Sequence, residues 1–146
     1  MTSPLDDAEM ARWIAWKRAN DAVTAAVASE LQNASDLSAP DFAVLSRVIE
    51  DGDGRMPQHE LGLMLDWQRA RLSRQLSRMA ERDLIARDGG PAGRRVVIAT
   101  DTGRNALATA RPAHARAVRR ALLSHATDDS FWTTVNTLSS PTDPAS

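Results

Sequence analysis

Apolar residues recur every three or four positions in two long stretches, one near each end of the chain, as is typical of amphipathic helices. The first stretch, residues 5–31, contains no Gly or Pro, and the second, residues 102–126, is rich in alanine. We expect Pro112 to bend the second helix or to mark a local break, because proline lacks a backbone donor. A last helix should open at Thr127-Asp-Asp-Ser, a capping sequence, and carry an apolar side. That side contains Phe131, Trp132, Val135 and Leu138.

The middle of the chain predicts three shorter helices. Ser38 and Pro40 form a capping start for an apolar helix that ends at the Asp-Gly-Asp-Gly sequence of residues 51–54. Pro57 starts a helix over 58–65, and a third helix follows over 68–82. In the helix over 58–65 we expect three side chains to point inward: Leu61, Met64 and Leu65.

A hairpin is predicted after these helices. It has a short strand over 84–87, a Gly-rich turn over 88–93 and a return strand over 94–100. Three short helices followed by a hairpin are the winged helix-turn-helix arrangement. The fold class predicted is therefore mainly α (α+β), a winged helix-turn-helix with long N- and C-terminal dimerisation helices.

This reading divides the chain into three parts. Residues 1–35 and 101–140 form a helical dimerisation region, because long helices without an apolar partner in the same chain usually pair with a second copy. Residues 36–100 form the winged-helix lobe. Residues 141–146, rich in Ser and Pro, are expected to be a disordered tail.

The helix over 68–82 has two chemically distinct sides. At about 100° per residue, Leu72, Leu76 and Met79 form one apolar stripe. The opposite side carries only arginine and small residues until Glu81. This combination suits the major groove, because arginine donates two hydrogen bonds to guanine and small residues allow a close approach. We expect Arg71 and Arg74 to contact base edges, with Ser73, Ser77 and Arg78 nearer the DNA backbone.

Charge is distributed unevenly along the chain. Residues 67–96 contain eight arginines and three acids, whereas the whole chain has a net charge of −1. A basic segment on an acidic body indicates a surface that meets a polyanion. The hairpin arginines fit the same partner, since a basic wing tip can enter the minor groove. The residues predicted to bind DNA are Gln68, Arg69, Ala70, Arg71, Ser73, Arg74, Ser77, Arg78, Arg87, Arg94 and Arg95.

Composition excludes several other classes of function. There is no cysteine, so thiol chemistry and disulfides are absent. No apolar run approaches the roughly 20 residues that span a bilayer, and no signal peptide is recognised, so we expect a cytoplasmic protein without membrane contact. No catalytic motif is found, which argues against an enzyme and against a bound cofactor. His59, His114 and His125 lack metal-ligand spacing, so no metal site is predicted.

The segment from Leu61 to Arg87, together with Val97-Ile-Ala-Thr-Asp-Thr-Gly103, resembles the MarR family of bacterial transcription regulators. The most specific parts are Asp83-Leu-Ile-Ala-Arg87 and the Thr100-x-x-Gly103 that closes the wing. The resemblance implies a homodimer that binds a palindromic operator as a repressor and is released by a small aromatic or anionic ligand.

The chain departs from the family pattern at the wing and at the start of the recognition helix. Family wings usually carry an acid where this chain has Ala92, two residues before Arg94, with Gly93 between them. Gln68 stands where many members have a Ser or Thr cap, so we expect Asp66 to supply that cap.

In this family, ligands often bind between the dimerisation helices and the lobe. Aromatic side chains suit the walls of such a pocket, although each of them also suits core or dimer packing. The candidate wall residues are Trp13, Trp16, Phe42 and Trp67. The alternative to DNA binding is a helical dimeric adaptor that binds an acidic protein. Salt dependence and competition by unrelated DNA distinguish the two.

Overall fold

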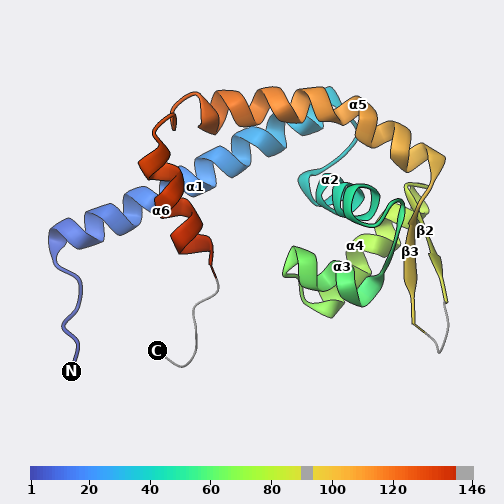
Figure 1. The fold of residues 1–146 in the computed structure, drawn as a ribbon, viewed down its shortest axis with the longest axis horizontal. Coiled ribbons are helices and arrows are strands. Elements are labelled where there is room, and N and C mark those ends of the chain that lie inside the picture. The colour runs from blue at the N-terminus through green and yellow to red at the C-terminus, as the bar shows by residue number, and fades with distance from the viewer. Residues whose placement is uncertain (90–93, 141–146) are drawn as a thin grey trace.

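The computed structural model consists of a long helical arm and a small winged-helix lobe (Figure 1). It describes residues 1–89 and 94–140. Helix α1 spans Asp7–Ala34, and its first turn is closed by a reciprocal capping box between Asp6 and Glu9. This cap explains why the helix begins two residues after the predicted start, because Asp6 accepts the Glu9 backbone N–H at 2.8 Å.

The C-terminal helices complete the arm. Helix α5 (Asp101–Val118) continues through Pro112, so of the two effects expected of this proline the break is absent. The π-helical turn η3 (Arg119–Leu123) extends the helix. Helix α6 (Asp129–Ser139) is capped by Asp128, one residue after the predicted Thr127. The α5 helix packs along the C-terminal half of α1, while the N-terminal half of α1 extends beyond it (Figure 1).

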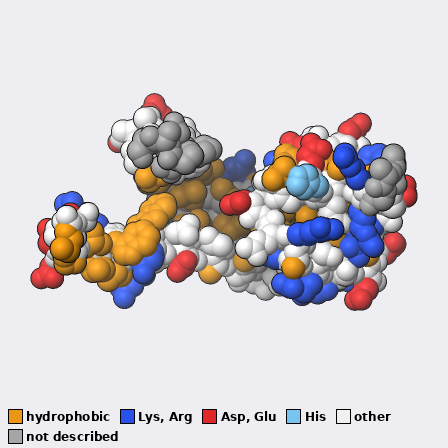
Figure 2. Space-filling view, turned by 90° about the horizontal axis from the view of Figure 1, so that it is seen from below, with side chains coloured by type: hydrophobic (Ala, Val, Ile, Leu, Met, Phe, Trp, Pro, Cys, Tyr) orange, Lys and Arg blue, Asp and Glu red, His pale blue; other side chains and the backbone are white. Residues whose placement is uncertain are grey.

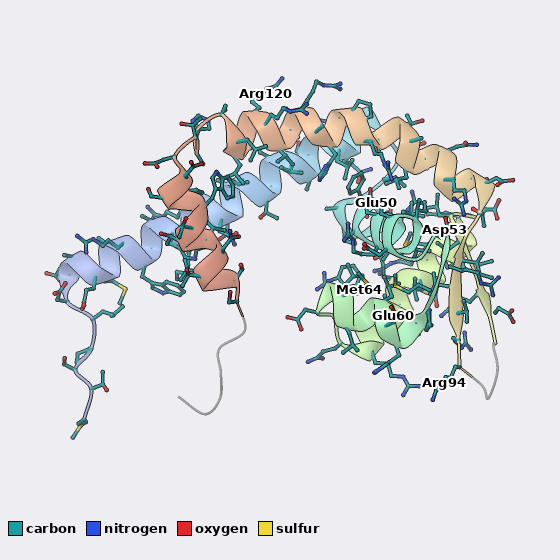
Figure 3. All side chains as sticks on the ribbon, viewed as in Figure 1. Glu50, Asp53, Glu60, Met64, Arg94 and Arg120 are labelled. Carbon is teal, nitrogen blue, oxygen red and sulfur yellow. The ribbon has the colours of Figure 1, made fainter. Side chains whose placement is uncertain are left out.

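The lobe contains the three predicted short helices. Helix α2 (Ala39–Ser46) starts at the predicted Ser38 cap and continues into the π-helical turn η1 (Arg47–Asp51). Helix α3 (Gln58–Leu65) has the predicted bounds. Helix α4 (Arg69–Glu81) is one residue shorter at each end than the predicted helix over 68–82. Leu61 is fully buried and Leu65 packs half-buried against the core, as predicted. The prediction for Met64 was wrong, because this residue is 43% exposed. Figure 3 shows Met64 on the side of α3 that faces away from the sheet.

The sheet has three antiparallel strands in the order β1-β3-β2. Strands β2 (Ile85–Asp88) and β3 (Val96–Ala99) are the predicted hairpin, with Arg87 opposite Val97. Strand β1 (Arg55–Pro57) was not predicted, because it is three residues long and exists through its pairing with β3. The predicted turn over 88–93 lies largely outside the described residues, as does the predicted disordered tail.

One buried core joins the lobe to the end of the arm. It includes Leu31 from α1, Val44 and Leu45 from α2, Leu76 from α4 and Leu107 from α5. Gly103 allows the closest approach, since a Cβ there would lie 2.1 Å from the Leu84 carbonyl oxygen. Thr100 caps α5 at this point by accepting the Gly103 N–H at 3.0 Å, so the Thr100-x-x-Gly103 element closes the wing against the arm. Among the described residues no helix has the length and apolarity needed to cross a bilayer.

A stacked pair links α5 to α2. The imidazole of His114 lies on the ring of Phe42, with centroids 4.2 Å apart. Burial lowers the pKa of His114 below its ordinary value, and the nearby Glu50 carboxylate partly offsets this shift. Glu50, in η1, also forms an ion pair with Arg111 of α5, with an N–O distance of 2.9 Å.

We predict that His114 makes stability depend on pH. Because its pKa is lowered in the folded state, the unfolded chain binds more protons just below pH about 6.5. The free energy of unfolding should therefore fall as the pH is lowered through this range. Urea titrations between pH 7.5 and pH 5 measure it. The His114→Gln variant should lose part of this dependence, and an identical pH dependence in both proteins would contradict the prediction.

Candidate nucleic-acid interface

Helix α4 presents the predicted faces. Leu72, Leu76 and Met79 are buried, as the apolar stripe required, and Gln75 is buried beside them. The outer face carries side chains that are exposed or half-buried. These are Arg69, Ala70, Arg71, Ser73, Arg74, Ser77 and Arg78.

A buried carboxylate holds α4 in place. The side chain of Asp41, 3% exposed, accepts hydrogen bonds from Gln75 Nε2 at 2.7 Å and from Arg82 Nη1 at 2.6 Å. The same carboxylate accepts the backbone N–H of Ser38 at 3.0 Å and so completes the α2 capping box. Sequence reasoning missed this network, since its partners are 34 and 41 residues apart. The network also shows that Arg82, one of the eight arginines of the basic segment, is paired with Asp41.

The N-terminus of α4 has no side-chain cap. Gln68 is the N-cap residue, and no side-chain hydrogen bond is formed there. The expectation that Asp66 would supply the cap was wrong, because Asp66 adopts a left-handed conformation (φ 54°) and ends α3 instead. Among the described residues, no side chain caps the first-turn N–H groups of α4. The positive end of a helix with free N–H groups favours an anion.

The arginines around α4 differ in how firmly they are held. The guanidinium of Arg71 lies over the indole of Trp67, 4.1 Å from the ring centroid. Arg78 donates to Gln75 Oε1 at 3.1 Å, and Arg87 of β2 donates to Ser77 Oγ at 2.9 Å. Within residues 1–89 and 94–140, Arg69 and Arg74 have no hydrogen-bond or ion-pair partner.

The wing places two more arginines beside this helix. Arg94 and Arg95 are exposed immediately before β3, and the Arg95 carbonyl accepts the Gln58 N–H at 2.9 Å. This bond joins the base of the wing to the start of α3. Figure 3 shows Arg94 on the side of the lobe away from α5. Ala92 and Gly93, where the sequence departs from the expected wing pattern, lie outside the described residues.

Basic side chains gather on one face of the lobe. Figure 2 shows Lys and Arg side chains over this face, which is turned away from α5, with acids mainly at its edge. Since the only lysine of the chain is Lys17 of α1, the basic side chains of the lobe are arginines. The arrangement provides a positively charged helix and an adjacent basic hairpin on the same surface.

The four aromatic residues predicted to line a ligand pocket do not come together within one chain. Trp13 and Trp16 are about half exposed on the free part of α1. Phe42 stacks on His114, and Trp67 packs against the core beneath Arg71. Periodicity places such residues on an apolar face but does not identify what covers that face.

Two hollows in the described part of the chain are lined by residues other than these four aromatic side chains. One, about 440 Å³, lies between the end of α1 and α5. The other, about 430 Å³, lies between the end of α1, α2 and α4, and includes Gln32, Asp41, Gln75, Arg78 and Arg82. No group of three His, Asp or Glu side chains arranged to hold a metal is found in the described part of the chain.

These features define a winged-helix protein in which α4 and the wing form one basic surface beside a long helical arm. Comparisons with known proteins agree with this class. Residues 40–100 match the model of a family described as a domain of unknown function, DUF7343. A search of curated proteins found no match.

Solved structures identify the fold more closely. AbsC, a MarR family transcriptional regulator from Streptomyces coelicolor, is 24% identical with a TM-score of 0.85, over 94% of each chain. Sco3205, a MarR family regulator from the same organism solved in complex with DNA, is 21% identical with a TM-score of 0.87, over 94% of this chain and 87% of that one. The organohalide-sensing regulator RdhR, solved with 2,4-dichlorophenol, is 17% identical with a TM-score of 0.76, over 94% of this chain and 85% of that one. The chain therefore has the MarR-family winged-helix fold, as the resemblance implied.

We predict that Asp41→Ala destabilises the protein by about 2–4 kcal/mol, because it removes a helix cap and leaves the buried Gln75 amide without its acceptor. Chemical denaturation measures the change. Asp51→Ala is the control, since it removes only a surface ion pair with Arg47 and should change stability by less than about 1 kcal/mol. Equal effects of the two substitutions would show that Asp41 does not organise the lobe.

Proposed function

We propose that the protein is a DNA-binding transcription regulator that inserts α4 into the major groove of duplex DNA. The observation that carries the proposal is the outer face of α4, where arginines and small residues are free of acids and lie next to the basic wing. The bond between Arg87 and Ser77 supports a common surface, because it ties β2 to this face of the helix. The complex of Sco3205 with DNA supports the same partner for a chain of this fold.

The proposed contacts follow from geometry. Arg71 and Arg74 lie on the exposed side of the first two turns and contact base edges. Arg69 and the free N–H groups of the first turn contact phosphates, as helix N-termini do. Ser73, Ser77, Arg78 and Arg87 lie along the DNA backbone. Arg94 and Arg95 enter the adjacent minor groove.

The proposed active form is a homodimer that binds a palindromic operator and represses transcription. The free half of α1 and helix α6 expose large apolar side chains, which a second copy would cover. They include Met10, Trp13, Trp16, Phe131 and Leu138. Two copies related by a two-fold axis present two recognition helices, and these require an inverted repeat.

Release by a small aromatic or anionic ligand completes the proposal. The support is the RdhR structure, which contains 2,4-dichlorophenol. A ligand bound between arm and lobe would change the distance between the two recognition helices and so weaken operator binding. Trp13 and Trp16 belong to such a site only if the second copy brings them to the lobe.

We predict sequence-specific, salt-dependent binding to DNA upstream of the protein's own gene. Titration against short duplexes spanning that region, at several salt concentrations, should identify one inverted repeat. The logarithm of affinity should fall with the logarithm of salt by roughly 0.9 per phosphate contact. The Arg71→Ala, Arg74→Ala double variant should lose about 30-fold or more in affinity, because each bidentate base contact contributes about 1–3 kcal/mol.

The control double variant is Arg116→Ala, Arg119→Ala. It removes the same charge from exposed positions on α5 and η3, on the arm rather than the lobe. It should bind the operator nearly as well as the natural sequence. Weak binding to every duplex, unaffected by Arg71 and Arg74, would contradict the proposal, and selective binding to an acidic protein without competition by DNA would favour an adaptor.

We also predict that the protein is a dimer in solution, and that Trp16→Glu makes it monomeric by placing a charge in the apolar interface. Light scattering coupled to gel filtration measures the mass. Leu63→Glu is the matched control, because Leu63 is 70% exposed on α3, within the lobe. A monomeric natural sequence, or equal effects of the two substitutions, would contradict the proposed interface.

A further inference from the structure

The turn before α4 contains a tryptophan whose ring supports an arginine of the recognition helix. Trp67 lies between α3 and α4, and its backbone N–H donates to the Gly62 carbonyl at 3.1 Å. Its side chain is half-buried and packs against the core of the lobe. The ring is therefore held by the scaffold, while Arg71 above it is exposed to solvent.

The contact restricts the position of the arginine. The guanidinium carbon of Arg71 lies 4.1 Å from the centroid of the Trp67 ring, within the range of a cation–π interaction. A cation–π contact occupies none of the guanidinium N–H donors in a hydrogen bond, so these donors remain available to DNA. Arg69 and Arg74 have no such support among the described residues.

Preorganisation matters for reading bases more than for contacting phosphates. A bidentate contact with guanine O6 and N7 requires two N–H groups in one plane at a fixed position. A phosphate accepts donors from many directions, so a mobile arginine serves it well. Of the first-turn arginines, Arg71 is the one whose geometry the protein has already restricted.

We propose that Trp67 is a specificity-determining positioning residue, which holds the Arg71 guanidinium so that it reads one guanine in each operator half-site. This inference rests on the proposed DNA binding and assigns a base to that surface. It also gives Trp67 a different role from a ligand-pocket wall, since Arg71 already covers one face of the ring.

The test is selection of binding sites from duplexes randomised at each position, using the full-length protein. The natural sequence should prefer guanine at one position of each half-site, and Arg71→Ala should lose that preference. Trp67→Leu, which keeps an apolar side chain but removes the ring, should reduce the preference at the same position about ten-fold. Trp67→Phe, which restores a ring, should recover much of it. The matched control, Arg69→Ala, should weaken binding to all sequences and reduce the salt dependence without changing the base preference.

The outcomes separate this inference from the function it rests on. If the natural sequence enriches no site, the proposed DNA recognition fails. If it enriches a site and Trp67→Leu keeps the full guanine preference, or weakens binding equally for every base, the positioning role is wrong. Thermal melting shows whether Trp67→Leu is folded. Should it not fold, Trp67→Met is measured against the same criteria, because it keeps a long apolar side chain without a ring.

Discussion

The lobe depends on one buried carboxylate. Asp41 completes the cap of α2 and, with its two oxygens, also binds Gln75 and Arg82 of α4. A carboxylate with this little exposure requires such partners, because removing a charge from water without them costs several kcal/mol. The angle between α2 and α4 is thus set by hydrogen bonds as well as by apolar packing. Apolar packing alone tolerates small rotations, whereas hydrogen bonds to a fixed carboxylate restrict them.

The same network limits the electrostatic cost of a basic recognition helix. Arg74, Arg78 and Arg82 are spaced four residues apart, and like charges at this spacing repel each other. The Asp41 carboxylate balances Arg82, and Gln75 links Asp41 to Arg78. The repulsion therefore falls mainly between Arg74 and Arg78, on the exposed side, where a polyanion would relieve it. Arginines with a partner in the lobe and arginines exposed to solvent therefore occupy the same helix.

Local signals in the sequence predicted most of the fold. The Ser38 cap, Pro57 and the stripe of Leu72, Leu76 and Met79 act within one or two helical turns, and the structure confirms them. Features that depend on distant contacts were missed. Strand β1 requires β3 as its partner, and the Asp41 network joins residues more than 30 positions apart.

For the site, too, features set by local sequence were predictable and features set by distant contacts were not. Exposure of the α4 arginines follows from helical periodicity and was predictable. The contact of Arg71 with Trp67 was not, because it depends on the path of the turn between α3 and α4, where Asp66 adopts a left-handed conformation. The aromatic pocket remains a prediction for a related reason. An apolar face on α1 has the same pattern whether a ligand, the core or a second chain covers it.

The junction at Thr100 joins the arm to α4 and to the wing. Its hydroxyl lies 2.6 Å from the Asp83 carbonyl oxygen, just beyond the end of α4, and 3.0 Å from that of Leu84, at the start of the wing. It also caps α5, the arm helix that follows. A side chain at Gly103 would separate these parts, because the Leu84 carbonyl occupies that space. Helix α4, the wing and the arm therefore meet within a few residues, and only Thr100 separates β3 from α5.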